Sequence, residues 1–333
     1  MTTVLYSEAL YADDQVERAV FGPEVDVRMR APESLAGLTD ADCTEADGLM
    51  LFRHWCSAAD IARFPRLRAI VRMGVGYDRI DRAAAAARGI LVCNVPDYGT
   101  MEVADHAIAL AVTLRRGVLL YHETQRHDPP APWEPIASPL IRRLGAQTFG
   151  IVGLGRIGTA AALRAKGLGF AVAFFDPYLP NGTELALGVA RARTLEKLLA
   201  QADVLSVHAP LTRETRGLIG ARELARLPAG AVLVNTARGP IVDLDAVEAA
   251  LRSGQLAGAG LDVVPQEPPV DVPPLLRAYR AREPWLDGRL VITPHAAFHS
   301  PEAWDDIRRK SAETMAAALL SSRPQNVIPP DAL

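Results

Sequence analysis

The chain has 333 residues, a net charge of −3, 49% hydrophobic residues and 23% charged residues. This length exceeds one ordinary hydrophobic core and favours two domains. Because no basic stripe is present, binding to nucleic acid or a membrane surface has no electrostatic support. Three widely spaced cysteines, Cys43, Cys56 and Cys93, argue against a disulfide framework and show no metal-ligand spacing. The N-terminus lacks a signal-peptide pattern and no apolar stretch could span a bilayer, so we expect a cytoplasmic protein.

Short apolar runs alternate with helix-like segments through the first 115 residues. Near-continuous apolar runs separated by helices are typical of buried parallel strands in βαβ units. Gly89 follows one helical segment, at the position where a left-handed residue commonly ends a helix. The predicted strands are Thr3–Tyr6, Val25–Met29, Gly48–Phe52, Leu67–Val71 and Ile90–Cys93, and the predicted helices are Asp13–Val20, Ser57–Phe64, Ile80–Arg88 and Glu102–Arg115.

A proline-rich segment, Tyr121–Ala146, precedes a second alternating region. Its prolines exclude a regular helix or a central strand there, and Pro265–Gly288 is predicted to be a second long connection. The strands expected in this region are Thr148–Val152, Phe170–Phe175, Val204–His208, Ala231–Asn235, Gly258–Asp262 and Leu290–Thr293, with helices at Arg156–Lys166, Thr194–Ala200, Leu244–Arg252 and Pro301–Leu320. The sequence therefore predicts an α/β protein with two doubly wound, parallel-sheet domains.

A glycine-rich turn joins a predicted strand to a predicted helix at the start of the second region. Gly153, Gly155 and Gly158 form the pattern G-x-G-x-x-G, and the next strand ends in Asp176, 18 residues beyond Gly158. Such glycines allow a tight turn, close approach of a pyrophosphate and helix–strand packing, while the acidic residue binds a ribose hydroxyl. Phosphates are favoured at the helix N-terminus, where Arg156 could add a positive charge. We expect NAD rather than NADP, because a carboxylate repels a 2′-phosphate and no arginine follows Asp176 to receive one.

Three polar residues, Arg238, Glu267 and His295, each follow a predicted strand of the second region. Doubly wound folds place their ligands at the C-terminal ends of strands. A histidine can donate a proton near neutral pH, and a neighbouring carboxylate favours the imidazolium form and orients the ring. An arginine can bind a carboxylate at two points and polarise a carbonyl. Singly, each residue could be a capping or surface residue, but beside a dinucleotide motif the three predict a catalytic constellation.

Over essentially its whole length the chain resembles the D-isomer-specific 2-hydroxyacid dehydrogenase family. The segments that carry the resemblance are Arg72–Asp78, Val103–Ala107, Gly153–Gly158, Val207–Thr212, Val234–Asp243 and those around Glu267 and His295. The resemblance implies a flavodoxin-like substrate domain, an NAD-binding domain, and NAD-dependent, reversible reduction of a 2-oxo acid to a D-2-hydroxy acid. It implies that Arg238, Glu267 and His295 are catalytic.

The same resemblance implies binding residues on both domains. The substrate carboxylate would be bound by backbone amides of Met73, Gly74, Val75 and Gly76, and the nicotinamide amide by Asp262. The other cofactor contacts that it implies are Gly153, Gly155, Arg156, Ile157, Gly158, Asp176, His208, Ala209, Pro210, Thr212, Thr236 and Ala237.

Within the family, the chain most resembles the branch that includes the C-terminal-binding protein corepressors. The segments Leu91–Pro96, Leu163–Lys166 and Phe175–Leu179 carry this similarity. Phe298 stands where those corepressors usually have tryptophan, so we expect a different substrate pocket that includes Phe298. Gly99 stands where most members have asparagine or serine, so we expect one polar contact near the cofactor or substrate to be missing. The family's formate dehydrogenases have glutamine in place of the glutamate, so Glu267 argues against that activity.

Arg53 ends a predicted strand, at a place similar to that of an arginine in 3-phosphoglycerate dehydrogenases. A second cation facing Arg238 would suit a substrate with a second anionic group, such as phosphonopyruvate or a phosphorylated hydroxy acid. A surface arginine at a strand end is the alternative interpretation.

We expect residues 1–100 and 299–333 to form the substrate domain and residues 101–298 the dinucleotide-binding domain, which would also form a homodimer. The predicted partner is a small 2-oxo or 2-hydroxy acid, with no metal, nucleic acid or membrane. Two other functions stay open at this point: an NAD(H)-sensing scaffold, as the corepressors are, and a phosphite dehydrogenase built on the same fold.

Overall fold

The computed structural model describes residues 1–321 and 323–330, and the chain divides into two compact units. Unit 1 contains Met1–Gly99 and the described residues from His299 onward, and unit 2 contains Thr100–Phe298. These divisions lie beside the domain boundaries expected from the sequence, and the roles expected for the two domains stay predictions.

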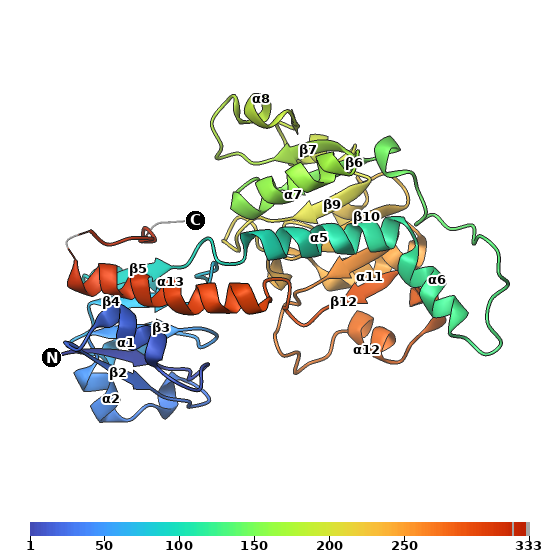
Figure 1. Ribbon diagram of the computed structural model, residues 1–333. Coiled ribbons are helices and arrows are strands. Elements are labelled where there is room, and N and C mark those ends of the chain that lie inside the picture. The colour runs from blue at the N-terminus through green and yellow to red at the C-terminus, as the bar shows by residue number, and fades with distance from the viewer. Residues whose placement is uncertain (322, 331–333) are drawn as a thin grey trace. The chain divides into compact units, whose positions relative to one another are not determined.

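Unit 1 is built on a five-stranded parallel sheet in the order β2-β1-β3-β4-β5 (Figure 1). The strands are β1 (Thr2–Tyr6), β2 (Val25–Met29), β3 (Gly48–Leu51), β4 (Ala69–Arg72) and β5 (Leu91–Asn94). This is the flavodoxin-like order of doubly wound sheets. Every residue of β3 is buried, as expected for a central strand that is covered on both faces.

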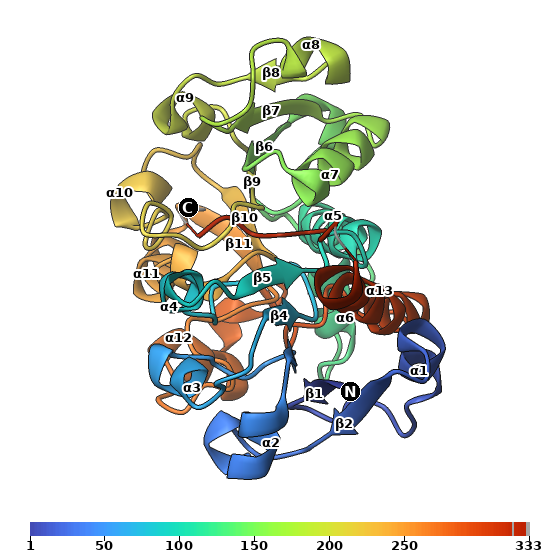
Figure 2. The same cartoon turned by 90° about the vertical axis from the view of Figure 1, so that its left-hand side faces the viewer.

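Helices cover both faces of this sheet. The unit contains α1 (Gln15–Phe21), α2 (Asp40–Glu45), α3 (Ala58–Ala62), α4 (Arg82–Ala87) and α13 (Pro301–Leu320). Helices α1 and α13 pack together on one face, and α3 and α4 lie on the other (Figure 2). Ser300 caps the N-terminus of α13 by accepting a hydrogen bond from the Ala303 amide, and Pro301 takes the first helical position, where a missing N–H costs nothing.

Unit 2 is built on a seven-stranded parallel sheet in the order β12-β11-β10-β9-β6-β7-β8. The strands are β6 (Thr148–Val152), β7 (Ala171–Phe175), β8 (Ala190–Arg191), β9 (Val204–Val207), β10 (Ala231–Asn235), β11 (Leu256–Leu261) and β12 (Leu290–Ile292). The chain winds in one direction from β6 to β8 and in the other from β9 to β12. Ligands of such folds bind outside the carboxyl ends of the strands where the order reverses, here between β6 and β9.

Two hydrophobic layers separate this sheet from its helices. The helices are α5 (Thr100–Arg115), α6 (Val118–Gln125), α7 (Arg156–Gly167), α8 (Thr183–Leu187), α9 (Leu195–Leu199), α10 (Ala221–Leu224), α11 (Leu244–Ser253) and α12 (Pro274–Arg280). One layer lies under α5 and α7 and the other under α9 to α12 (Figure 2). The expected α/β fold of two doubly wound parallel-sheet units is therefore confirmed.

The fold corrects two predicted connections. Residues 121–125 of the proline-rich segment belong to α6, which ends before the first proline of that segment. The predicted loop Pro265–Gly288 contains α12, because Pro273 precedes the helix and Pro274 starts it, so neither blocks an internal hydrogen bond. The short elements α2, α8, α10 and β8 were not predicted, since so few residues carry no clear periodicity.

No helix formed by the described residues is long and apolar enough to cross a membrane.

Candidate active site

His295 and Glu267 meet at the carboxyl edge of the unit 2 sheet. His295 follows β12 and Glu267 follows β11, and the distance from His295 Nδ1 to Glu267 Oε2 is 2.6 Å. The backbone of His295 has a φ of 53°, a left-handed conformation that is uncommon for residues other than glycine. No hydrogen bond among the described residues uses Nε2 of His295, whose side chain is 30% exposed. This ring nitrogen is therefore available to a ligand.

The Glu267 carboxyl is placed to remain an anion. Burial raises the pKa of Glu267. Hydrogen bonds from His295 and the Val264 amide, together with the charges of His295 and Arg238, lower it by more, so the pKa lies below its usual value. His295 therefore faces a carboxylate that is ionised at neutral pH.

Arg238 is brought near this pair by two loops that touch. It follows β10 and is half-buried, and its charge is felt at Glu267. A Cβ atom on the next residue, Gly239, would lie only 1.9 Å from the carbonyl carbon of Val264. Glycine is required at this position because the backbone that follows Arg238 runs directly against the backbone that precedes Glu267.

Asp262 anchors the loop that carries His295. Its carboxylate is almost fully buried and accepts hydrogen bonds from the amides of Ala296 and Ala297, at 2.9 and 3.0 Å. It also accepts one from the hydroxyl of Thr293 at 2.6 Å. With three donors from its own chain, Asp262 fixes the backbone on both sides of His295.

His106, on α5, extends this hydrogen-bond network. Its Nε2 atom lies 3.0 Å from Oγ1 of Thr293. The single hydroxyl proton of Thr293 is directed to the Asp262 carboxylate, which only accepts. His106 must therefore donate from Nε2, which fixes its tautomer if it is neutral. The sequence analysis assigned no role to His106 or Thr293, although the Val103–Ala107 motif contained the histidine.

The glycine-rich turn between β6 and α7 has the geometry that its pattern predicts. Gly153 has a φ of 88°, and a Cβ atom on Gly158 would lie 2.2 Å from the carbonyl oxygen of Gly153. A Cβ atom on Gly155 would meet nothing within 4 Å. Helix and strand therefore pack closely at Gly158, while the space at Gly155 is open to a phosphate.

Two buried polar atoms that follow neighbouring strands have no hydrogen-bond partner among the described residues, Nδ1 of His208 and Oγ1 of Thr236. His208 follows β9, which pairs with β6, and Thr236 follows β10, which pairs with β9. The residue after His208, Ala209, packs against Gly153, so close that a Cβ atom on that glycine would lie 2.8 Å from its Cα. Burial lowers the pKa of His208 to about 4, which keeps the ring neutral at physiological pH.

Asp176 ends β7 and closes the turn from the other side. Its carboxylate accepts hydrogen bonds from the amides of Leu154 at 2.9 Å and Tyr178 at 3.0 Å. The expectation that no arginine could reach a phosphate here is wrong. Strand β8 pairs with β7, and Arg191 and Arg193 line one cavity with Asp176.

In unit 1, the segment Met73–Gly76 follows β4. The Gly74 carbonyl accepts a hydrogen bond from the Val95 amide at 3.1 Å, and the Val75 carbonyl accepts one from the Asn94 side chain at 2.7 Å. No hydrogen bond among the described residues uses the amide N–H of Val75 or Gly76. These two amides are the donors that a carboxylate could use.

Arg53 lies two residues after β3 of unit 1 and has an exposed side chain. The guanidinium carbons of Arg53 and Arg72 lie 5.4 and 5.7 Å from the ring centre of Phe52. The sequence analysis missed Glu8, whose carboxylate accepts hydrogen bonds from the backbone amides of Phe52, Arg53 and His54. Glu8 therefore occupies the three backbone amides at this strand end.

Residues 108–297, more than half of the chain, match the family described as D-isomer specific 2-hydroxyacid dehydrogenase, NAD binding domain. The chain belongs to this family. A glyoxylate reductase of Korarchaeum cryptofilum is 40% identical over 268 residues, which cover 79% of this chain and 76% of that protein. A glycerate dehydrogenase of Methylorubrum extorquens is 34% identical over 276 residues, covering 81% and 82%. A D-lactate dehydrogenase of Aquifex aeolicus, solved with NAD and lactic acid, superposes with a TM-score of 0.81 at 25% identity, covering 95% of each chain.

Membership of the 2-hydroxyacid dehydrogenases confirms two of the expectations drawn from the sequence. The chain is an NAD-dependent 2-hydroxyacid dehydrogenase that reduces 2-oxo acids to 2-hydroxy acids, and its cofactor is NAD. The turn at Gly153–Gly158, the acid at Asp176 and the two unpartnered buried atoms fit this cofactor. The similarity to the corepressor branch stays a prediction.

Several residues predicted for this dehydrogenase's site lie together in unit 2. His295 and Glu267 are hydrogen-bonded, and the charge of Arg238 lowers the pKa of Glu267. The ring centre of Phe298 lies 6.3 Å from that of His295. Arg53 and Met73–Gly76 belong to unit 1. No group of three metal-binding side chains occurs among the described residues.

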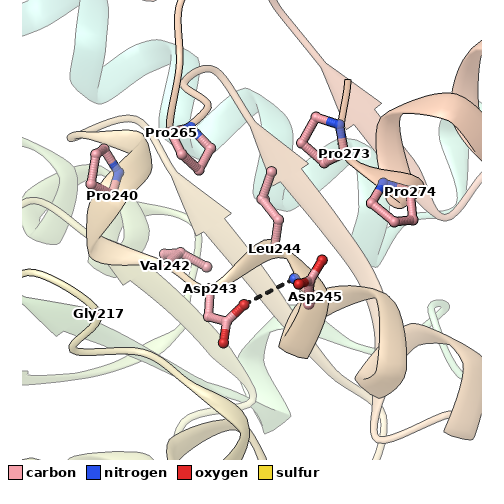
Figure 3. A pocket seen from close by; sticks show the side chains of 9 residues that line it. All are labelled: Gly217, Pro240, Val242, Asp243, Leu244, Asp245, Pro265, Pro273 and Pro274. Atoms are coloured by element: carbon pink, nitrogen blue, oxygen red, sulfur yellow. Dashed lines mark hydrogen bonds between the residues drawn. The ribbon is translucent and has the colours of Figure 1, made fainter. Parts of the chain in front are cut away.

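A separate cavity of about 440 Å³ lies beside the loops that carry the predicted catalytic residues of the dehydrogenase (Figure 3). It is lined by Gly217, Pro240, Val242, Asp243, Leu244, Asp245, Pro265, Pro273 and Pro274. The dashed line in Figure 3 marks Asp243 accepting a hydrogen bond from the Asp245 amide, which caps α11. Arg238, Glu267 and His295 are not among its lining residues, so the cavity is not the reaction centre.

Proposed function

We propose that the chain reduces a small 2-oxo acid to the D-2-hydroxy acid, with His295 as proton donor, Glu267 as its partner and Arg238 as the clamp on the substrate. The observation that carries this proposal is the 2.6 Å contact between His295 and Glu267 at the carboxyl edge of the sheet that also carries the dinucleotide turn. NADH, when bound, supplies the hydride to C2 of the oxo acid.

The side chains act on the charge that develops at the carbonyl oxygen. His295 donates the proton from Nε2, the ring nitrogen that no described residue uses. Glu267 stabilises the imidazolium before transfer and orients the ring. Arg238 binds the carboxylate and polarises the carbonyl. In unit 1, the amides of Val75 and Gly76 are the donors that we propose for a carboxylate. In the reverse direction His295 accepts the proton of the hydroxy acid.

The names of the curated relatives favour small substrates. One is a glyoxylate reductase and the other a glycerate dehydrogenase, at 40% and 34% identity. We therefore expect glyoxylate or hydroxypyruvate to be a better substrate than a large 2-oxo acid such as phenylpyruvate. The test is to measure kcat/KM for NADH oxidation with each of these acids. A higher kcat/KM for phenylpyruvate than for glyoxylate and hydroxypyruvate would contradict this substrate class.

A second anionic group on the substrate is the finer hypothesis. It rests on Arg53 and Arg72, whose guanidinium groups flank the Phe52 ring in unit 1. Arg53→Ala should then lower kcat/KM for phosphonopyruvate and phosphohydroxypyruvate by about tenfold or more, while glyoxylate is nearly unaffected. An equal effect on all three acids would contradict the hypothesis.

The two other functions would give different results in the same assays. Phosphite oxidation would appear as NAD reduction with phosphite, and an NAD(H)-sensing scaffold would bind NADH without turning over any 2-oxo acid. We also propose that the chain forms a homodimer, which sedimentation velocity would test.

A further inference from the structure

The cavity beside Asp176 has a volume of about 400 Å³ and is lined by Arg191 and Arg193 on the side of β8. An acid at the end of this strand binds the 2′-hydroxyl of the adenosine ribose, the position that carries a phosphate in NADP. Two arginines beside that position would ordinarily favour the phosphate. NAD is nevertheless the cofactor, so a group next to the arginines must offset their charge.

The guanidinium of Arg191 is bound to backbone carbonyls of its own chain. Its guanidinium donates hydrogen bonds to the carbonyls of Asp176, Leu179 and Pro180, at 3.0, 2.7 and 2.9 Å. Its side chain is only 7% exposed. Turning toward a ligand would break all three of these hydrogen bonds.

Arg193 is the guanidinium that could reach a phosphate, and Glu184 holds it. The side chain of Arg193 is 57% exposed and donates to Asn181 Oδ1 at 2.8 Å. Glu184, on α8, has its Oε1 atom 3.4 Å from Nη2 of Arg193 and its Oε2 atom 3.5 Å from Nη1 of Arg191. A hydrogen bond from its own backbone amide, and the charges of both arginines, lower the pKa of Glu184 against its partial desolvation, so it is ionised at neutral pH.

We propose that Glu184 is a second determinant of cofactor choice, which keeps a 2′-phosphate out by holding Arg193 and neutralising the charge of the two arginines. The positive charges of Arg191 and Arg193 are matched by the negative charges of Asp176 and Glu184. Without Glu184 the cavity carries a net positive charge and Arg193 is released to bind a phosphate. The inference rests on the proposed position of the adenosine ribose beside Asp176.

The test uses the full chain without cofactor and measures binding of two fragments by calorimetry. Adenosine 5′-monophosphate represents NAD, and adenosine 2′,5′-bisphosphate represents NADP. Glu184→Gln should strengthen binding of the bisphosphate by roughly tenfold and change binding of the monophosphate by less than about twofold. Adding Arg193→Gln should remove the gain. Glu196→Gln removes an exposed carboxylate whose neighbouring arginines are Arg222 and Arg226 rather than Arg191 and Arg193, and it should leave both affinities unchanged.

Three results would overturn the inference. An unchanged affinity of Glu184→Gln for the bisphosphate, with normal monophosphate binding and an unchanged melting temperature, would contradict the role of Glu184. A gain that persists after Arg193→Gln would contradict the role of Arg193. If Asp176→Asn bound the monophosphate as well as the unsubstituted chain, the proposed ribose position itself would be wrong, a failure that the Glu184 variants alone cannot produce.

Discussion

His295 takes its position from its neighbours more than from its own side chain. Asp262 binds the two amides that follow it, Glu267 binds its ring, and Thr293 joins this network to His106. The left-handed backbone at His295 is maintained by these contacts. Changes at any of them should therefore act on proton transfer before they act on substrate binding.

Glu267→Gln should lower the rate of 2-oxo acid reduction. The pKa of Glu267 lies below its usual value, so the carboxylate is ionised throughout the neutral range. Glutamine keeps a hydrogen-bonding side chain at this position but not the negative charge that supports His295 as proton donor. We therefore expect a loss of about tenfold or more in kcat/KM at neutral pH, measured by steady-state kinetics. An unchanged kcat/KM would contradict the pairing.

His106→Phe should lower kcat about tenfold with little change in KM, because the phenyl ring cannot donate to Thr293. His106→Gln retains a side-chain N–H donor and should recover part of the rate. Steady-state kinetics of both variants would check this. Equal rates for Phe and Gln would show that the hydrogen bond at this position does not matter.

Residues that follow a predicted strand could be assigned from the sequence, whereas residues that act through distant hydrogen bonds could not. Arg238, Glu267 and His295 each follow a strand that the apolar pattern marks, so their common edge could be expected. His106 contacts Thr293 in unit 2 and Glu8 contacts the Arg53 amide in unit 1, across 187 and 45 positions of sequence. No local sequence pattern indicates such a partner.

At the scale of elements, α5 is held against the sheet of unit 2 by a buried arginine. Arg115 is 1% exposed, and its guanidinium donates hydrogen bonds to the carbonyls of Gly230, Pro139 and Asp203. Burial lowers the pKa of Arg115 to about 10, so it remains charged at neutral pH. One side chain thus ties the end of α5 to the residues that precede β9 and β10.

Arg115→Met should lower the free energy of unfolding by about 3 kcal/mol, because three carbonyls lose the buried guanidinium that donates to them. Arg116→Met is the matched control, since Arg116 is exposed and adjacent, and it should cost less than about 0.5 kcal/mol. Urea unfolding followed by circular dichroism measures both. Equal effects would mean that the buried contacts of Arg115 contribute nothing specific.

Elements with strong apolar runs were predictable to the residue. Strands β2, β6 and β10 and helix α13 have the bounds expected from the sequence. The failures are α6 and α12, where proline suggested a loop although each helix has its prolines outside or at its first turn. Position within a helix, rather than the presence of proline nearby, decides its effect.

At the scale of the whole molecule, the alternation of strands and helices was sufficient to predict two doubly wound sheets. The orders β2-β1-β3-β4-β5 and β12-β11-β10-β9-β6-β7-β8 follow from right-handed crossovers on each side of a first strand. What the sequence could not show was the pairing of the two-residue strand β8 with β7, which brings Arg191 and Arg193 to Asp176. The NAD preference was thus predicted correctly although one of its reasons was wrong.

The most direct test of the account is the reduction of glyoxylate by NADH with the unsubstituted chain and with His295→Gln. We predict saturable NADH oxidation by the unsubstituted chain and a loss of about 10³-fold in kcat/KM for the variant. NADH affinity, measured by fluorescence, should stay within about twofold, because no cofactor contact is assigned to this side chain. A variant that retains more than about a tenth of the activity would contradict the assignment of His295 as the proton donor.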